Sequence, residues 1–242
     1  MFSAPLAILG GIKLGVYSAK REHERKGRED IVDFLIRAVT AWGYSVPLFL
    51  TGLLSLSIFF VNLQWFTPER LGSQAQFFVG FGAWKSYTGL FTIDALLNGQ
   101  LWIFLDALSH LVLPVATLTI SLLPVVVRVT RSSMLGELGR QYAIAAKARG
   151  LEKMEVINRV RKNAMGPVLT ISSIIFASML TGIVVTEYTF SLGGVGSLAL
   201  GAAKSYDFTL LVGISLFFCA IFVAVNTIVD IAYTYIDPRV EL

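Results

Sequence analysis

Residues of the types that perform catalysis are scarce in this sequence, which contains two histidines and one cysteine among 242 residues. A hydrolytic centre needs a nucleophile beside a general base, and a metal centre needs several ligands at suitable spacing. His23 lies in a charged run and His110 lies at the edge of an apolar run. Asp94 and Asp106 lie outside the clearest apolar runs. We predict that all four are solvated or interfacial, and that the chain has no catalytic residue and no metal site.

Two other chemistries find no support in the sequence. Cys219 lies alone inside an apolar run, so we interpret it as a small buried hydrophobic residue. No segment has the spacing G-x-x-x-x-G-K followed by Ser or Thr, whose glycine-rich loop cradles nucleotide phosphates. We expect no cofactor in this chain.

The composition indicates a protein of the lipid bilayer. Hydrophobic residues make up 55% of the chain and charged residues 15%, and the mean hydropathy is +0.70. Soluble proteins carry about 25% charged residues, so much of this surface never meets water. The formal net charge is only +4, and nucleic-acid binding would require a soluble basic face.

Five membrane spans are predicted, because a helix needs about 20 mostly apolar residues to cross the hydrocarbon core. Pro167 suits the first position of one span, and Asp207 and Asp230 flank another. One short span contains Pro114 and Pro124, so we expect it to be kinked and extended upstream through residues 101–108. The predicted spans are residues 1–12 running on to Ala19, Ala38–Val61, Leu111–Val127, Val168–Thr186 and Phe208–Val229.

Basic residues predict the orientation, since cytoplasmic loops near span ends are enriched in Lys and Arg. Sixteen of the 20 basic residues lie either between the first two spans or between the third and fourth. We therefore expect the N-terminus outside and the C-terminus in the cytoplasm. The charged run from Lys20 to Asp30 is interpreted as a solvated loop. The outer connection, about residues 62–110, is rich in aromatic residues, which suggests an interfacial belt with a short helix at Leu90–Leu97. Contact with substrate is the alternative role for these aromatic residues.

The segment from Arg128 to Pro167 is patterned as helix, turn and helix. Its alanine-rich stretch ends in basic residues, which suit a helix C-terminus, and Gly150 then stops the helix in the left-handed conformation. Leu151 supplies the hydrophobic contact that often accompanies such a cap. Small alanines in this loop, about residues 132–167, allow another protein to approach closely.

The phrase from Gln141 to Thr170 resembles the cytoplasmic loop of permease subunits in binding-protein-dependent ABC importers. The phrases at Glu187–Gly196 and Tyr233–Val240 resemble the branch that transports dipeptides, oligopeptides and nickel. Carried over residue by residue, the resemblance covers three groups. They are Tyr142, Ala146, Ala148, Gly150, Asn163, Ala164 and Pro167 in the loop that couples to the ATPase; Glu187, Phe190, Gly194 and Gly196 in the outer phrase; and Asp237, Pro238 and Arg239 in the C-terminal phrase.

The chain also departs from the family pattern. Arg159 replaces a frequent histidine, Gly166 a usual leucine and Gly193 a usual proline, and the two glycines should loosen the local backbone. The family fold has six spans with both termini inside, whereas this chain begins within what would be the second. We therefore expect a shortened variant or a start site assigned too late.

The resemblance implies an all-α polytopic bundle, residues 1–242 forming a single permease domain in the cell membrane. It implies a second permease subunit, two ATPase subunits that bind ATP and Mg²⁺, and an extracytoplasmic substrate-binding protein. The expected substrates are peptides, with nickel or oligosaccharides as alternatives. The chain itself would transmit motion rather than catalyse a reaction.

An ion-coupled secondary transporter or a channel is the alternative. Such proteins usually need ionisable groups within the membrane. Four of the predicted spans contain none, which counts against a proton relay. The spacing of Gly11 and Gly15 also allows a close contact between helices, although one such pair is a weak signal.

Overall fold

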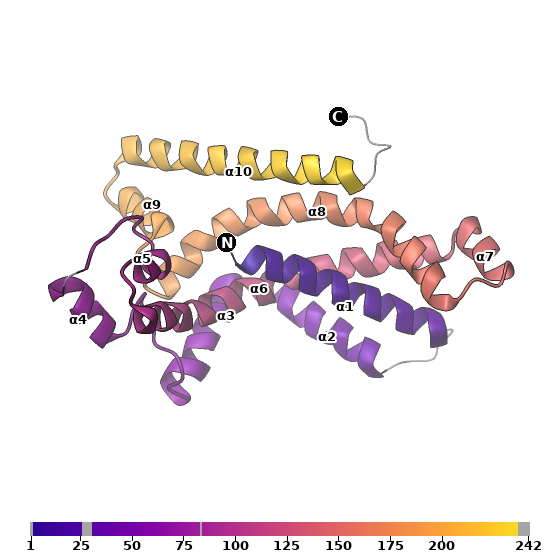
Figure 1. Cartoon of the computed structure of the whole chain (residues 1–242), viewed down its shortest axis with the longest axis horizontal. Helices are drawn as coiled ribbons and strands as arrows, with labels where there is room; N and C mark the ends of the chain where they lie inside the picture. Colours follow the sequence, from indigo (N-terminus) through magenta and orange to yellow (C-terminus); the bar gives the residue numbers. More distant parts are fainter. Residues whose placement is uncertain (1, 26–30, 83, 237–242) are drawn as a thin grey trace. The chain divides into compact units, whose positions relative to one another are not determined.

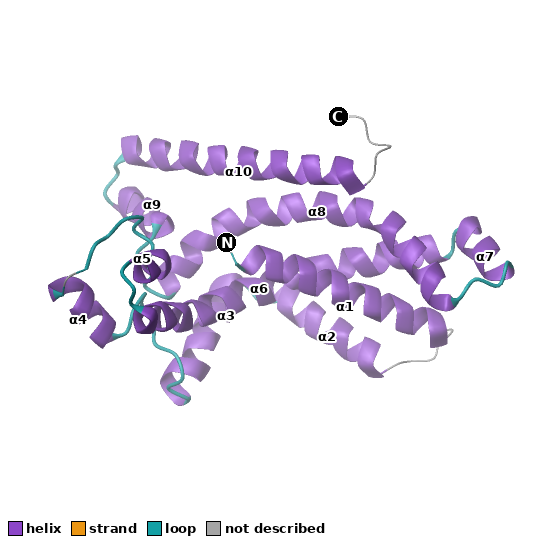
Figure 2. Cartoon of the chain, viewed as in Figure 1, coloured by secondary structure: helices purple, strands orange, loops and turns teal. Residues whose placement is uncertain are grey.

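A computed structural model describes residues 2–25, 31–82 and 84–236, and these ranges contain helices and loops without a strand (Figure 2). The all-α prediction is therefore confirmed. Asp237, Pro238 and Arg239 lie outside the described residues. The elements are α1 (Ser3–Arg25), α2 (Ile31–Ser45), α3 (Leu48–Ser55), the π-helix η1 (Leu56–Asn62), α4 (Ser73–Phe81), α5 (Phe91–Leu97), α6 (Leu101–Leu138), α7 (Gln141–Ala148), α8 (Lys153–Thr189), α9 (Val195–Lys204) and α10 (Phe208–Ile236) (Figure 1).

Three of the described helices are long and apolar enough to cross a membrane: α6, α8 and residues Phe208–Ile228 of α10. A fourth span is formed if α2 is counted together with α3 and η1 as one broken span. The predicted first span is indeed helical, but α1 does not meet the same criterion because its lysines lower its hydropathy. The polytopic helical class is confirmed.

The predicted span Ala38–Val61 is not one helix. α2 already begins at Ile31 and ends at Ser45, and Pro47 then precedes α3 with an extended backbone (φ −57°, ψ 142°). Proline lacks an N–H and disfavours a helical conformation in the residue before it, so Val46 and Pro47 separate the two helices.

α6 and α8 are longer than predicted. The expected extension of α6 to Leu101 is confirmed, and the helix continues past the last apolar residues to Leu138. Pro167 does not open a new helix, because it lies inside the continuous α8. A proline in a helix interior costs about 3 kcal/mol, but the buried side chains of Ala164 and Val168 pack into clusters on either side of it. Packing therefore maintains one helix across the proline.

The chain divides into two compact units. The first unit comprises residues 1–46, 119–180 and 216–242, and the second comprises residues 47–118 and 181–215. α6, α8 and α10 each contribute residues to both. The assignment of all 242 residues to a single permease domain remains a prediction.

In the first unit, α1 lies directly against α6. A Cβ atom on Gly11 would lie 2.5 Å from Val126 Cβ, and one on Gly15 would lie 2.6 Å from Thr130 Cβ. The two glycines therefore form the close helix contact that their spacing suggested. The prediction of a solvated loop that begins at Lys20 is wrong for residues 20–25, because α1 continues to Arg25.

In the second unit, two residues predicted to be solvated or interfacial are buried. Asp94 is 1% exposed and accepts hydrogen bonds from Thr88 N, Thr88 Oγ1, Gly89 N and Ser86 Oγ. Burial opposes ionisation of this carboxyl, but the hydrogen bonds outweigh it and hold the pKa of Asp94 below its ordinary value of 3.8. Asp94 thus anchors the loop that precedes α5.

His110 is the other, at 7% exposure. Its Nδ1 lies 2.8 Å from the Asp106 carbonyl oxygen, which can only accept, so Nδ1 donates this hydrogen bond. Its Nε2 faces Thr67 Oγ1 at 2.7 Å. His110 is therefore a structural residue that joins the Thr67 segment to α6. The other two residues of that prediction, His23 and Asp106, are not buried.

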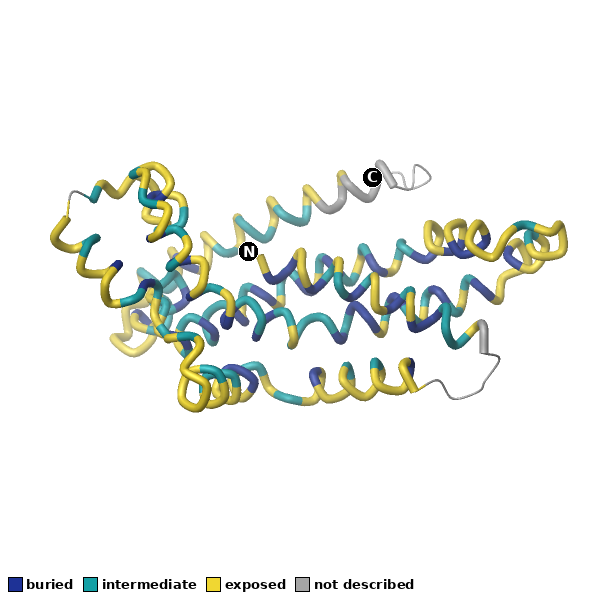
Figure 3. The backbone as a smooth tube through the Cα atoms, turned by 60° about the horizontal axis from the view of Figure 1, so that its bottom comes forward, coloured by how far each residue is buried: buried dark blue, intermediate teal, exposed yellow. Residues whose placement is uncertain are grey.

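α10 is exposed over most of its described length (Figure 3). Only 6% of its most apolar stretch is buried by the rest of the chain. Cys219 is exposed on this helix, so its prediction as a buried residue is wrong.

Candidate functional site

The loop between α6 and α8 has a defined backbone structure. α7 ends in two bonds, from Gly150 N to Lys147 O at 3.0 Å and from Leu151 N to Ala146 O at 3.3 Å. This pair of bonds is the Schellman motif, and Gly150 adopts the left-handed φ of +79° that the motif requires. The predicted helix and glycine stop are confirmed, whereas the predicted second helix is the first part of the continuous α8 and does not end before Pro167.

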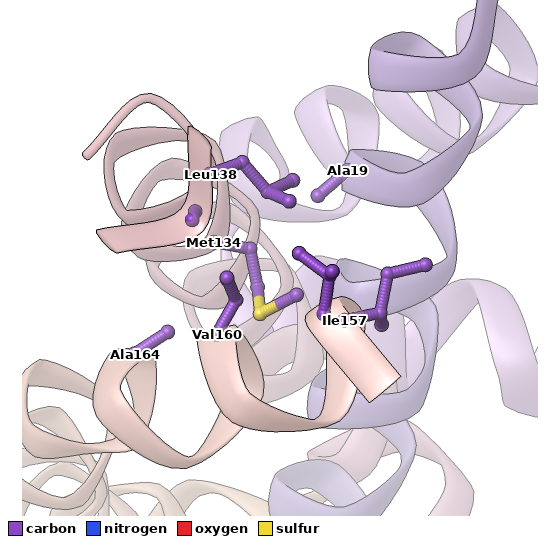
Figure 4. Close-up of a cluster of buried hydrophobic side chains, with 8 residues drawn as sticks. Ala19, Met134, Leu138, Ile157, Val160 and Ala164 are labelled. Carbon is purple, nitrogen blue, oxygen red and sulfur yellow. The ribbon is translucent and has the colours of Figure 1, made fainter. Parts of the chain in front are cut away.

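α7 is held in place by a cluster of buried apolar side chains. The cluster brings together Ala19 of α1, Met134 and Leu138 of α6, Ala143 of α7, and Val156, Ile157, Val160 and Ala164 of α8. Figure 4 shows Leu138, Met134, Val160 and Ile157 pointing toward one another from the facing helices. Ala146 packs on the edge of this cluster. The small side chains of Ala143 and Ala146 allow α7 to lie close to its neighbours.

Three polar residues connect α7 to the adjoining helices. Tyr142 Oη donates a hydrogen bond to Glu137 Oε2 at 2.8 Å, and the side chain of Asn163 also bonds to the Tyr142 hydroxyl. Burial raises the pKa of Tyr142 above 10, with a further contribution from Glu137. The structure thus brings together Tyr142 and Asn163, two of the predicted loop residues.

The side of α7 opposite the buried Ala143 is exposed. Ile144 is 57% exposed, and Ala145 and Ala148 are exposed beside it. We call Ile144, Ala145 and Ala148 the α7 face. Of the predicted loop residues, Ala148 lies on this face, Ala164 lies in the core, and Pro167 lies on an exposed side of α8. Sequence reasoning missed Ile144, whose signal was a β-branched apolar residue within an otherwise small or charged stretch.

The outer phrase forms a second organised turn. The Glu187 carboxylate lies over the start of α9, where Ser197 N donates to Glu187 Oε2 at 3.0 Å. Gly194 is the residue that precedes the helix, so this bond reaches the third helical residue, as a helix cap does. A Cβ atom on Gly194 would overlap the carboxylate, and one on Gly196 would lie 2.6 Å from Val184 Cα. Glycine is needed at residue 196 for space, because the close atom belongs to the α8 backbone, whereas a side chain at residue 194 would displace the Glu187 carboxylate.

The rest of this turn binds a distant segment of the same unit. Phe190 is 1% exposed, and its carbonyl accepts a bond from Glu69 N at 2.9 Å. Arg70 donates to the carbonyls of Leu192 and Gly193, the latter at 2.7 Å. All four predicted residues of the outer phrase therefore lie in one turn, and Arg70 is a contact that sequence reasoning did not identify.

The backbone conformation at Gly193 explains why this chain has glycine where the family usually has proline. Its φ is +60°, whereas a proline ring holds φ near −65°. A proline therefore cannot replace Gly193 without a different backbone at this turn.

The fold defines a multi-pass helical membrane protein with an ordered loop between α6 and α8 and a capped turn between α8 and α9. Residues 11–242 match the family described as the inner membrane component of binding-protein-dependent transport systems. The chain belongs to this family.

Curated relatives narrow the resemblance further. The chain is 33% identical over 236 residues to the dipeptide transport system permease protein DppB of Haemophilus influenzae, covering 97% of this chain and 67% of the relative. It is 33% identical over 233 residues to DppB of Escherichia coli, covering 96% and 66%. It is 33% identical over 232 residues to the di/tripeptide permease DppB of Pseudomonas aeruginosa, again covering 96% and 66%. The chain thus spans about two thirds of the length of these relatives.

Proposed function

We propose that this chain is a permease subunit of an ABC importer for short peptides and that the α7 face docks onto a separate ATPase subunit. The observation that carries the proposal is the α7 face itself. An exposed isoleucine flanked by exposed alanines lies on a helix that a Schellman turn and a buried cluster hold rigid. A rigid, small-residue surface with one apolar anchor suits docking to a protein.

The orientation follows from the same region. Basic residues concentrate on the α6–α7–α8 loop and on the segment between α1 and α2, so this side is cytoplasmic. The Glu187–Gly196 turn then faces outward, where an extracytoplasmic binding protein delivers substrate. A second permease subunit completes the translocation path, and ATP and Mg²⁺ bind only to the two ATPase subunits.

Purification in mild detergent from the native membrane tests the docking step. We expect an ATPase subunit to accompany the wild-type chain and to be lost with Ile144→Glu, which places a charge on the α7 face without altering the core. Ile31→Glu is the matched control, because Ile31 is 75% exposed at the start of α2. An intact, folded wild-type chain that never brings down an ATPase would reject the proposal.

Substrate class requires a separate measurement. The assembled complex, reconstituted in vesicles with its binding protein, should take up labelled dipeptides when ATP is present on the α7 side. Uptake should be competed by other short peptides and not by nickel or oligosaccharides. Competition by nickel or an oligosaccharide alone would reassign the substrate while leaving the docking result intact.

A further inference from the structure

A groove of about 700 Å³ lies between α2 and α6 in the first unit. The two helices are in contact at one end of it, because a Cβ atom on Gly43 would lie 3.1 Å from Pro124 Cγ. Arg37 and Arg128 line the groove toward its other end. Ala41 of α2 and Val125 of α6 line the stretch between these ends, and Tyr44 lines the groove next to the Gly43 contact.

Both walls of the groove change from uncharged to basic residues at the same level. On α2, Arg37 immediately precedes the uncharged segment that begins at Ala38. On α6, Arg128 immediately follows the uncharged segment that ends at Val127. In a membrane-spanning chain, such points mark the edge of the hydrocarbon core. The groove therefore runs from the lipid-chain region to the level of the headgroups.

The basic end has more positive charge than its carboxylates neutralise. Arg37 Nε pairs with Asp33 Oδ2 at 3.1 Å, and Arg131 pairs with Asp33 and Glu22. Arg128 is exposed, and in the part of the chain that the structure describes its side chain has no hydrogen bond or ion pair. A guanidinium binds a phosphate through two parallel hydrogen bonds. The open end of the groove thus offers a cation for a phosphate.

We propose that this groove binds one anionic phospholipid of the leaflet on the α7 side. The Arg128 guanidinium would hold the headgroup phosphate, and an acyl chain would lie along Ala41, Tyr44 and Val125. A phospholipid has the same order of apolar and charged parts as the groove, and basic pockets at helix ends are suited to anionic headgroups. The inference requires only that the chain spans the membrane, so it stands or falls separately from the peptide and ATPase proposals.

Native mass spectrometry of the detergent-purified chain, with any subunits that accompany it, provides the test. The protein is delipidated and titrated with an equal mixture of phosphatidylglycerol and phosphatidylcholine that have identical acyl chains. We expect roughly a fivefold preference for phosphatidylglycerol in the first bound lipid, the amount that one basic residue near a membrane surface supplies.

Two variants and their controls locate the site. Arg128→Gln should abolish the preference, whereas Arg128→Lys should retain it and Arg161→Gln, an exposed arginine on α8 outside the groove, should leave it unchanged. Ala41→Phe fills the groove and should reduce binding of both lipids. Ala38→Phe, on the same helix but outside the lining, should not.

Several results would overturn the proposal. They are equal binding of the two lipids, a preference that survives Arg128→Gln, or displacement by inorganic phosphate together with normal binding to Ala41→Phe, which would indicate an anion site without a lipid. A preference found for the separate chain but absent from the assembled complex would also reject it, because another subunit would then cover the groove.

Discussion

The turn after α7 and the turn before α9 both depend on glycine, but for different physical reasons. Around Gly150 no atom lies within 4 Å of the position that a Cβ would take, yet its φ is +79°. Gly194 and Gly196 have negative or helical backbone angles, yet their Cβ positions are occupied by Glu187 and Val184. The turn after α7 therefore needs glycine for its backbone conformation, and the turn before α9 needs glycine because a side chain has too little space there.

The two turns also differ in what holds them. The α7 turn is closed by backbone bonds and by a buried apolar cluster. The α9 turn is closed by the carboxylate of Glu187, and the nearby α5 loop by that of Asp94. The α7 turn therefore depends mainly on backbone bonds and apolar packing, whereas the α9 turn and the α5 loop depend on carboxyl groups that accept hydrogen bonds.

The largest effect is expected for Gly196→Ala. The new Cβ would lie 2.6 Å from Val184 Cα, and the backbone of α8 cannot move aside easily. We expect a loss of about 1–3 kcal/mol, the usual cost of overpacking. Thermal unfolding in detergent measures it. Gly201→Ala, on the same helix with open space around it, is the control. Equal unfolding midpoints for the two variants would show that lack of space does not explain the glycine at residue 196.

Gly150→Ala should have a smaller effect of about 1–2 kcal/mol, because it forces an alanine into the left-handed conformation without a clash. Gly150→Asn should cost less, since asparagine tolerates this conformation better. Gly136→Ala, in an open helical position of α6, is the control. Hydrogen exchange of residues 141–151 measures the change. A Gly150→Asn variant that is no better than Gly150→Ala would contradict the conformational explanation.

Acid should affect the two regions unequally. Because the pKa of Asp94 is lowered in the folded protein, its ionised form contributes stability above the ordinary value of 3.8, and this contribution is lost as the pH falls through the folded-state pKa. Lowering the pH from 5 to 3 should therefore expose residues 84–98 to limited proteolysis more than residues 141–157. Asp94→Asn should open the same loop already at pH 5. If both regions were equally sensitive to acid, the α5 loop would not depend on the Asp94 carboxylate more than the α7 turn depends on its own contacts.

The smallest effect is expected for Glu187→Gln. The amide oxygen can still accept the bond from Ser197 N, so the loss is limited to the attraction between a negative charge and the start of a helix, about 0.3–1 kcal/mol. Thermal unfolding with and without high salt separates this charge effect. Glu187→Ala, which removes the cap altogether, should cost more. If both variants were equally destabilised, the charge would be the main contribution.

Much of the α7 loop could be predicted because its determinants are local. An alanine-rich helix, a glycine stop and the hydrophobic residue that follows lie within a few residues of one another, and the structure confirms each. The family match over residues 11–242 likewise follows from phrases visible in the chain.

Predictions failed where distant segments decide the outcome. Local signals favoured a helix start at Pro167, but packing of Ala164 and Val168 carries α8 through it. The failure at Asp94 is a local one: it was expected to be solvated, but the turn at residues 86–89 folds over it and supplies its hydrogen bonds. α4 and α9 were not predicted, because helices of nine and ten residues are too short to give a sustained periodic signal.

The sequence by itself determined the solvent, the helical class, the family and the glycine-capped loop, because hydropathy, charge distribution and capping act over short stretches of chain. Only the tertiary structure decided which side of α7 is buried, that Glu187 caps α9, and that Arg37 and Arg128 share one groove. The buried side of α7 and the shared groove arise from residues far apart in sequence, whose proximity depends on how whole helices pack. The Glu187 cap depends on how the chain turns between α8 and α9.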